Sequence, residues 1–171
     1  MFEDSSTLRT VFVTGLNNAH ALENQALSLM DRQIERLEQY PEMEAMLRQH
    51  RVETEGQIAR LEEILASLGE THSALKDAAL SFSGNMAAIG HSFSGDEVIK
   101  NSFANYAFEN FEIASYTGLI TMAEDGFQSS VSALQMTLGE EQRMADWVRE
   151  HIPATTRRYI ALREEGLQAS H

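Results

Sequence analysis

The chain has 171 residues, 43% of them hydrophobic, and its 26 acidic and 13 basic side chains give a formal net charge of −13. This composition suits one domain with an apolar core over residues 1–171, and the acidic balance argues against nucleic-acid binding, which needs a cationic surface. Cysteine is absent, which excludes disulfides and thiolate metal ligands. Neither an 18-residue apolar run nor a signal-peptide pattern occurs, so we expect no membrane insertion and a cytoplasmic location.

Two long helices are predicted first, over residues 6–39 and 42–68, because apolar residues recur in both segments at intervals of three and four. Pro41 disfavours helical backbone at Tyr40 and suits the first turn of the helix that follows. Gly69 is a natural helix C-cap. The short break between the two helices predicts an antiparallel hairpin.

The remainder of the chain repeats this arrangement. Residues 70–95 have a weaker pattern and are predicted to be a crossover that holds a short helix over 74–89. Long helices are then expected over 96–125 and 129–152, and Pro153 is expected to begin a short C-terminal helix over 154–167. No strand pattern appears in the sequence. The predicted fold is all-α, a four-helix bundle of two antiparallel hairpins joined by a long crossover.

Acidic and imidazole side chains interrupt the apolar stripe of all four long helices. In chain order they are Glu23, His50, Glu53, Glu109, Glu112 and Glu141. Burying a carboxylate without a partner costs several kcal/mol, which is comparable with the whole stability of a domain. Acids at core positions of four helices therefore need a compensating partner, and a pair of metal ions would provide it.

The four carboxylates of Glu23, Glu53, Glu112 and Glu141 are expected at one level of the bundle. Glu23 precedes the first turn by about seventeen residues, and Glu53 follows it by about twelve. Glu112 precedes Gly126 by about fourteen residues, and Glu141 follows it by about fifteen. In antiparallel hairpins these offsets differ by only about one helical turn, so the side chains should meet.

Carboxylates combined with imidazole suit iron or manganese, and two ions about 3.5–4 Å apart can share bridging carboxylates. Di-metal bundles use a Glu from each of two helices and a Glu/His pair from each of the other two. Here the first such pair is reversed, as His50 and Glu53, and Met144 stands where a second histidine would be. We expect two metal ions, iron before manganese, bound by Glu23, His50, Glu53, Glu112 and Glu141, with Glu109 as a sixth ligand. The side chains expected to hold these ligands by hydrogen bonds are His20, Gln57, Tyr106 and Tyr116.

Each of these residues also has a purely structural interpretation. A single Glu on a helix is usually solvated, and Glu109 could lie at the surface. His50 could equally be a hydrogen-bonded histidine at the core boundary, and His20 and Tyr116 are more typical packing or hydrogen-bonding residues than ligands. The interior glycines are interpreted as positions of close helix approach; they are Gly56, Gly118 and Gly139.

Four segments resemble the YciF-type ferritin-like stress proteins. They are Glu23-Asn-Gln, His50-Arg-Val-Glu53-Thr-Glu-Gly-Gln57, Glu109-Asn-Phe-Glu112-Ile-Ala-Ser-Tyr116 and Thr137-Leu-Gly-Glu140-Glu141. The resemblance implies a ferritin-like bundle related to rubrerythrin, bacterial origin, a cytoplasmic location, a homodimer and a role in stress. The chain departs from that family where His20, Asn110 and Gly139 stand in place of Tyr, His and Glu.

Two functions are therefore weighed. The first is a di-metal carboxylate protein that reacts with oxygen or peroxide. The second is a metal-free stress protein that acts through dimer or partner contacts, because the aromatic residues over 103–116 are too widely spread for one helix face and some must pack elsewhere. An enzyme with an organic substrate is less favoured, since neither a nucleotide-binding loop nor a nucleophile arrangement is present.

Overall fold

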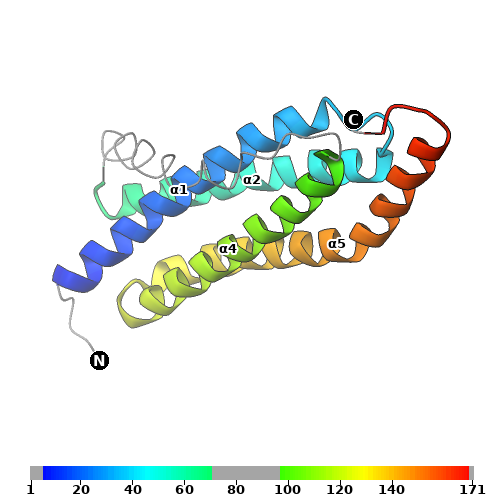
Figure 1. Cartoon of the computed structure of the whole chain (residues 1–171). Coiled ribbons are helices and arrows are strands. Elements are labelled where there is room, and N and C mark those ends of the chain that lie inside the picture. Colours follow the sequence, from blue (N-terminus) through cyan, green and yellow to red (C-terminus); the bar gives the residue numbers. More distant parts are fainter. Residues whose placement is uncertain (1–5, 71–96, 170–171) are drawn as a thin grey trace.

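Four long helices make up most of the structure, a computed structural model that describes residues 6–70 and 97–169 (Figure 1). α1 (Ser6–Ile34) and α2 (Pro41–Ser67) form one hairpin, and α4 (Glu97–Gly126) and α5 (Val131–Glu164) form the other, with the 3-10 turn η1 (Gln128–Ser130) between them. No strand occurs in these ranges, and none of their helices is long and apolar enough to cross a membrane. The all-α four-helix bundle is confirmed. The predicted crossover, with its short helix at 74–89, lies outside the described residues apart from Glu70.

α1 ends at Ile34, five residues earlier than predicted, and turns fill the interval before α2. The amides of Leu37 and Tyr40 each donate to the carbonyl three residues earlier, in place of the helical bond to the fourth. These turns place Leu37 and Tyr40 in the core, where both are buried. Pro41 begins α2 as the sequence predicts. The apolar pattern therefore continues past the end of the helix because turn residues also pack inward.

The break expected at Pro153 is wrong, because α5 continues through this residue to Glu164. A proline inside a helix removes one backbone hydrogen bond and costs about 3 kcal/mol relative to alanine. Figure 1 shows the orange-to-red end of α5 turning away from the line of its first part. This end carries Leu162, which is fully buried against the α1–α2 turn, and we attribute the tolerance of Pro153 to that packing.

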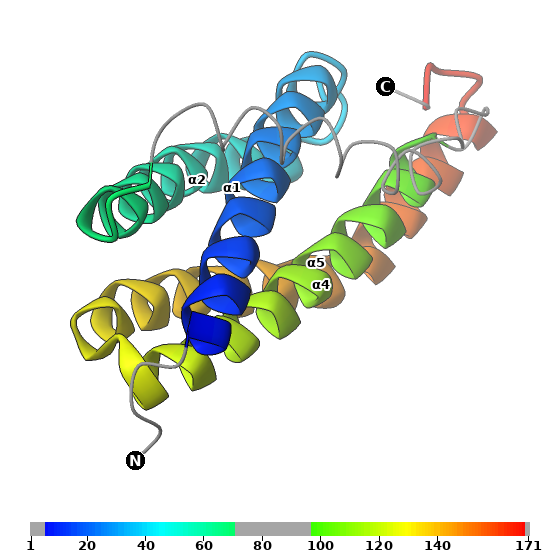
Figure 2. The same ribbon diagram turned by 90° about the vertical axis from the view of Figure 1, so that its left-hand side faces the viewer.

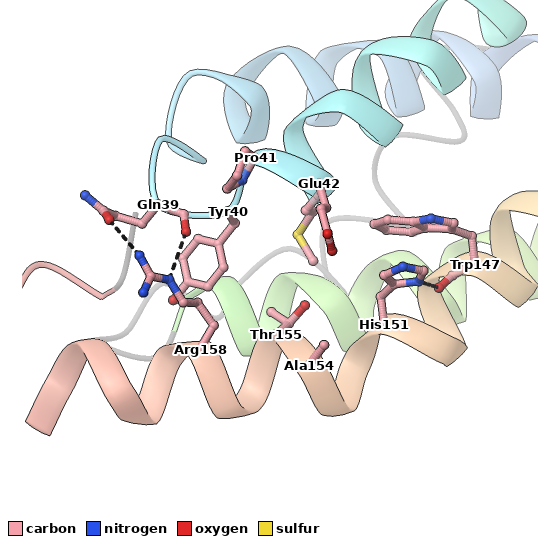
Figure 3. A pocket seen from close by; sticks show the side chains of 10 residues that line it. Gln39, Tyr40, Pro41, Glu42, Trp147, His151, Ala154, Thr155 and Arg158 are labelled. Carbon is pink, nitrogen blue, oxygen red and sulfur yellow. Dashed lines mark hydrogen bonds between the residues drawn. The ribbon is translucent and has the colours of Figure 1, made fainter.

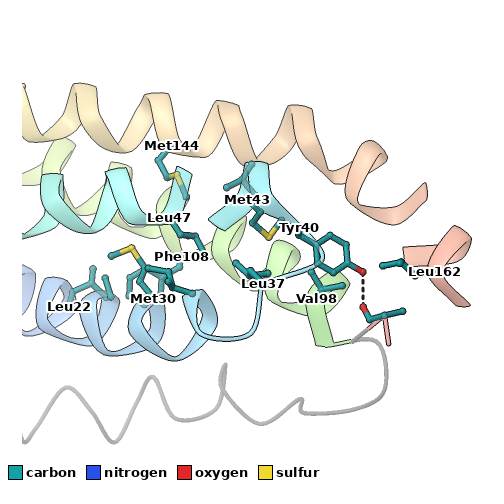
Figure 4. Packing of buried hydrophobic residues seen from close by; sticks show 14 residues of the cluster. Leu22, Met30, Leu37, Tyr40, Met43, Leu47, Val98, Phe108, Met144 and Leu162 are labelled. Atoms are coloured by element: carbon teal, nitrogen blue, oxygen red, sulfur yellow. Dashed lines mark hydrogen bonds between the residues drawn. The ribbon is translucent and has the colours of Figure 1, made fainter. Parts of the chain in front are cut away.

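Two apolar clusters fill the core, and every helix contributes to both. The cluster nearer the α1–α2 turn includes Met30, Leu47, Phe108 and Met144 (Figure 4). The cluster nearer η1 includes Leu16, Leu61, Leu119 and Leu134. On α2, α4 and α5 a group of buried polar residues lies between the two clusters along the helix, and on α1 Glu23 lies at their boundary. The apolar core therefore surrounds one polar layer.

Replacing Leu162 by alanine should destabilise the protein by about 2–5 kcal/mol, because it deletes a fully buried side chain from the core. Leu167, just beyond α5 and 51% exposed, is the matched control, and its replacement by alanine should change stability by no more than about 0.5 kcal/mol. Urea unfolding measures both. Equal effects would show that the end of α5 is not part of the core.

Candidate metal centre

The polar layer contains four carboxylates and one imidazole, and each of these residues is at most 5% exposed. In chain order they are Glu23 on α1, His50 on α2, Glu109 and Glu112 on α4, and Glu141 on α5. Ligand atoms of His50, Glu109 and Glu141 all lie within 4.8 Å of one another. The Nε2 atom of His50 is 3.3 Å from Glu109 Oε2 and 3.6 Å from Glu141 Oε2. Three of the predicted ligands, each on a different helix, thus converge on one point.

Glu23 and Glu112 are buried in the same layer. The hydroxyl of Tyr116 donates to Glu23 Oε1 over 2.5 Å, which gives Tyr116 the ligand-holding position expected from the sequence. Neither carboxylate oxygen of Glu112 has a hydrogen-bond partner among the described residues. The alternative of a surface position for Glu109 is excluded by its burial.

The donor atoms of this layer fit a cation. Five buried carboxylate oxygens accept no hydrogen bond from the described residues, although two of them face His50 Nε2. They are Glu23 Oε2, Glu109 Oε2, both oxygens of Glu112 and Glu141 Oε2. More than nine-tenths of buried polar groups in proteins have a partner, so five such atoms in one layer are exceptional. Oxygen donors with one imidazole are a ligand set that suits iron or manganese.

Glu53, expected to be a ligand, lies at the edge of the layer. Its side chain is 21% exposed, and its Oε2 atom is 3.2 Å from His50 Nδ1. Its Oε1 atom faces Gln49 and, at 3.7 Å, Arg143. A carboxylate on one ring nitrogen fixes the orientation and tautomer of a histidine, which here directs Nε2 toward Glu109 and Glu141.

Gln57 is fully buried and links the layer to the α5 surface. Its amide Nε2 donates to Glu141 Oε1 and, over 3.0 Å, to Glu140 Oε2. Glu140 in turn pairs with the guanidinium of Arg60. The sequence places Glu140 away from the core and does not identify Arg60. Their contacts follow from the approach of α2 to α5, which no pattern within one helix can indicate.

Two other residues expected to support the ligands have different surroundings. His20 Nε2 is 3.0 Å from Glu62 Oε1 on α2, and its other neighbour is Asn24. Tyr106 packs against the apolar cluster near the α1–α2 turn. The structure therefore shows neither residue in contact with a carboxylate of the layer.

The electrostatics of the layer favour bound protons. Burial raises the pKa of Glu23 from 4.5 to about 8, although the bond from Tyr116 and the charge of His50 act in the opposite direction. Burial and the neighbouring carboxylates also raise the pKa of Glu112 and of Glu141 well above the ordinary value. For His50, burial disfavours the charged ring, but the acids around it outweigh burial and raise its pKa. A cation that enters must displace these protons.

A separate pocket of about 280 Å³ lies beside the α1–α2 turn and contains none of these residues (Figure 3). Trp147 and His151 stack along it with ring centres 3.8 Å apart, and Arg158 bonds to Gln39 at its opposite end. Tyr40 also lines the pocket, and its hydroxyl donates to the carbonyl of Ala169. The carboxylate layer and this pocket are therefore distinct features.

A protein-family model described as Domain of unknown function (DUF892) matches residues 7–161, which include every residue of the layer. A solved structure of a protein from Xanthomonas campestris is 29% identical, covers 92% of this chain and 99% of its own, and has a TM-score of 0.76.

Two further solved structures are 23% identical and share the fold. The Escherichia coli stress protein YciF covers 86% of this chain and 96% of its own, with a TM-score of 0.67. A protein of Rhodopseudomonas palustris named YcfI, described as a candidate structural protein, covers 87% and 97%, with a TM-score of 0.63. The resemblance to YciF-type proteins is thereby confirmed.

Metal-free protein should lose stability as the pH rises from about 5 to about 8. An acid whose pKa is higher in the folded than in the unfolded chain contributes stability below its unfolded value and loses that contribution as the pH rises through the folded value. For Glu23 the pKa is about 8 in the folded chain and 4.5 in the unfolded chain. The pKa values of Glu112, Glu141 and His50 are also raised in the folded chain.

Thermal unfolding at pH 5, 6, 7 and 8 in the presence of a chelator measures this effect. The substitution Glu23→Gln should flatten the fall in Tm, since it removes one proton-linked group and leaves an oxygen for Tyr116 to donate to. Glu35→Gln, at an exposed position, should keep the wild-type slope. A wild-type Tm that rises or stays constant over this interval would contradict the assigned protonation.

Proposed function

We propose that this chain, which belongs to the family described as Domain of unknown function (DUF892), binds a pair of transition-metal ions, iron or manganese, in its buried layer. The observation that carries the proposal is the set of five buried carboxylate oxygens that accept no hydrogen bond within residues 6–70 and 97–169. Protonation would lower the charge of such a layer, and each protonated carboxyl could donate one hydrogen bond to a neighbour. Cations would satisfy both the charge and the lone pairs.

The proposed ligands are Glu23, His50, Glu109, Glu112 and Glu141. Two helices supply one of these carboxylates each, α4 supplies two, and α2 supplies the imidazole. Glu53, predicted as a ligand from the sequence, is proposed instead to position His50 through Nδ1. Tyr116 and Gln57 would orient Glu23 and Glu141 by donating to one oxygen of each, which leaves the other oxygen for an ion.

Bound iron or manganese would supply one-electron chemistry toward oxygen or peroxide. The chain itself contributes a layer closed above and below by apolar clusters, which limit the access of water. Tyr116 and His50 hold protons at the layer, on the phenol oxygen and the imidazole ring. The description of the Escherichia coli neighbour as a stress protein supports a role in the response to stress.

The substitution Glu112→Gln should lower the number of metal ions bound per chain, because it removes the carboxylate with no other partner. Glu124→Gln, at an exposed position on the same helix, makes the same change in charge and should bind metal as wild type does. Equilibrium dialysis against Fe²⁺ without oxygen, or against Mn²⁺, followed by elemental analysis measures both variants. Equal metal content in Glu112→Gln and wild type would refute the ligand set.

A second function, the metal-free protein that acts through protein contacts, is favoured by one observation. Phe103 and Phe111 on α4 are each about half exposed, which is unusual for phenylalanine, whereas Phe108 and Tyr116 on the same helix are buried. We propose that this part of α4 contributes to a homodimer, as the resemblance implied.

Light scattering tests the dimer directly. The expected mass is about twice that of the 19.1 kDa chain, and Phe103→Ser should shift the population toward single chains. Phe2→Ser, a replacement of the same type at the start of the chain, serves as a control. A single-chain mass for wild type at high concentration would contradict the dimer.

A further inference from the structure

The line along which α2 and α5 face each other is the most loosely packed boundary between neighbouring helices of the described residues. We call it the α2–α5 seam and define it by residues 53–60 and 137–143. The two helices make far fewer close backbone approaches than α4 makes with α5 or α1 with α2. In Figure 2 the α4–α5 hairpin runs from the lower left to the upper right, and α2 lies above the lower-left part of α5. The seam therefore joins the two hairpins at the level of the carboxylates.

Two ion pairs cross the seam in opposite directions. Arg60 of α2 reaches Glu140 of α5, and Arg143 of α5 lies 3.7 Å from Glu53 of α2. Arg60 is also bonded to Thr137 and Met136, and its side chain is 20% exposed. Arg143 is 64% exposed, and this long contact is its one ion pair among the described residues. Arg60 is therefore fixed, whereas Arg143 can move.

Each arginine lies over a glycine four residues earlier in its own helix. A Cβ atom added to Gly56 would meet Arg60 Nη1 at 3.6 Å, and one added to Gly139 would meet Arg143 Nη1 at 3.6 Å. No atom of the facing helix is within 4 Å of either position, and Gly118 has no atom there at all. The interpretation of these glycines as positions of close helix approach is wrong. Gly56 and Gly139 instead leave room for a guanidinium against the helix.

Polar side chains connect the seam with the layer. Glu53 and Glu140 are partly exposed, at 21% and 12% of their side chains. Each contacts a fully buried group, Glu53 at His50 and Glu140 at Gln57. The Oε1 atom of Gln57 is buried without a hydrogen bond, although its Nε2 atom bonds to Glu140 and Glu141. A cation moving inward would thus meet the carboxylates of Glu53 and Glu140 first, and beyond them Gln57, whose Nε2 atom lies between Glu140 and Glu141.

We propose that the α2–α5 seam is the entrance through which a divalent cation reaches the buried layer. Glu53 and Glu140 receive the ion, and Arg143 is the cover that moves away from Glu53 as the ion arrives. The inference rests on the proposed function. The apolar clusters close the layer at both ends of the bundle. The other pairs of neighbouring helices pack more closely against each other than α2 and α5 do.

The first test compares rates of Mn²⁺ uptake by metal-free protein, followed in a stopped-flow instrument with a chelating dye that reports free Mn²⁺. Arg143→Gln should speed uptake about three- to tenfold at low ionic strength, because it removes the cover and a positive charge. Arg149→Gln makes the same change on the same helix at similar exposure and should leave the rate unchanged. Equal rates of Mn²⁺ uptake for Arg143→Gln and wild type would contradict the proposed entrance.

A variant with the opposite expectation completes the test. Glu140→Gln should slow uptake at least threefold, because it removes a carboxylate that receives the ion, and Glu150→Gln, which is exposed on the same helix, should not. If each pair of variants takes up Mn²⁺ at the same rate, the seam is not the route.

Bound Mn²⁺ per chain, measured after overnight equilibration, separates the two proposals. Full occupancy with altered rates in the seam variants supports the entrance. Full occupancy with unaltered rates rejects the entrance and leaves the metal-binding proposal in place. A wild-type protein that binds no Mn²⁺ or Fe²⁺ at equilibrium rejects the metal-binding proposal, and the entrance with it.

Discussion

Four carboxylates and one imidazole share a single layer inside the bundle, and five of the carboxylate oxygens accept no hydrogen bond from the part of the chain that the structure describes. The remainder of the structure can be understood from this constraint. Burial makes charge costly, so the pKa values of three of the acids rise and the layer retains protons when no cation is present. The same burial strengthens the binding of a cation to these acids, because the attraction between opposite charges is stronger away from water.

The apolar core keeps the layer in place. Each helix carries apolar residues on both sides of its polar position or at the boundary of the two clusters, so that sliding one helix by a turn would bring an acid against leucine. Contacts between helices then orient individual groups: Tyr116 on α4 holds Glu23 on α1, and Gln57 on α2 holds Glu141 on α5. Such contacts preorganise the open oxygens that the proposed ions would use.

The sequence predicts the helices and most of the layer because both depend on one periodicity. The sequence is less informative where two adjacent residues both fit the helical spacing and only one of them can point into the core. Glu53 and Thr54 lie three and four residues after His50, and the structure buries Thr54 while Glu53 stays at the edge. Pro153 was expected to end a helix, but it is exposed on the outer side of α5, where one lost hydrogen bond can be tolerated. Glu140 and Arg60 pair across helices, and no spacing within either helix indicates that contact.

The most direct test of the central claim is anomalous X-ray diffraction from crystals of the protein grown with Mn²⁺. We expect two manganese peaks in the buried layer, among the side chains of Glu23, His50, Glu109, Glu112 and Glu141. Peaks confined to surface acids, or a layer that stays free of manganese at saturating Mn²⁺ and Fe²⁺, would contradict it. The layer would then be a set of protonated acids within a structural bundle.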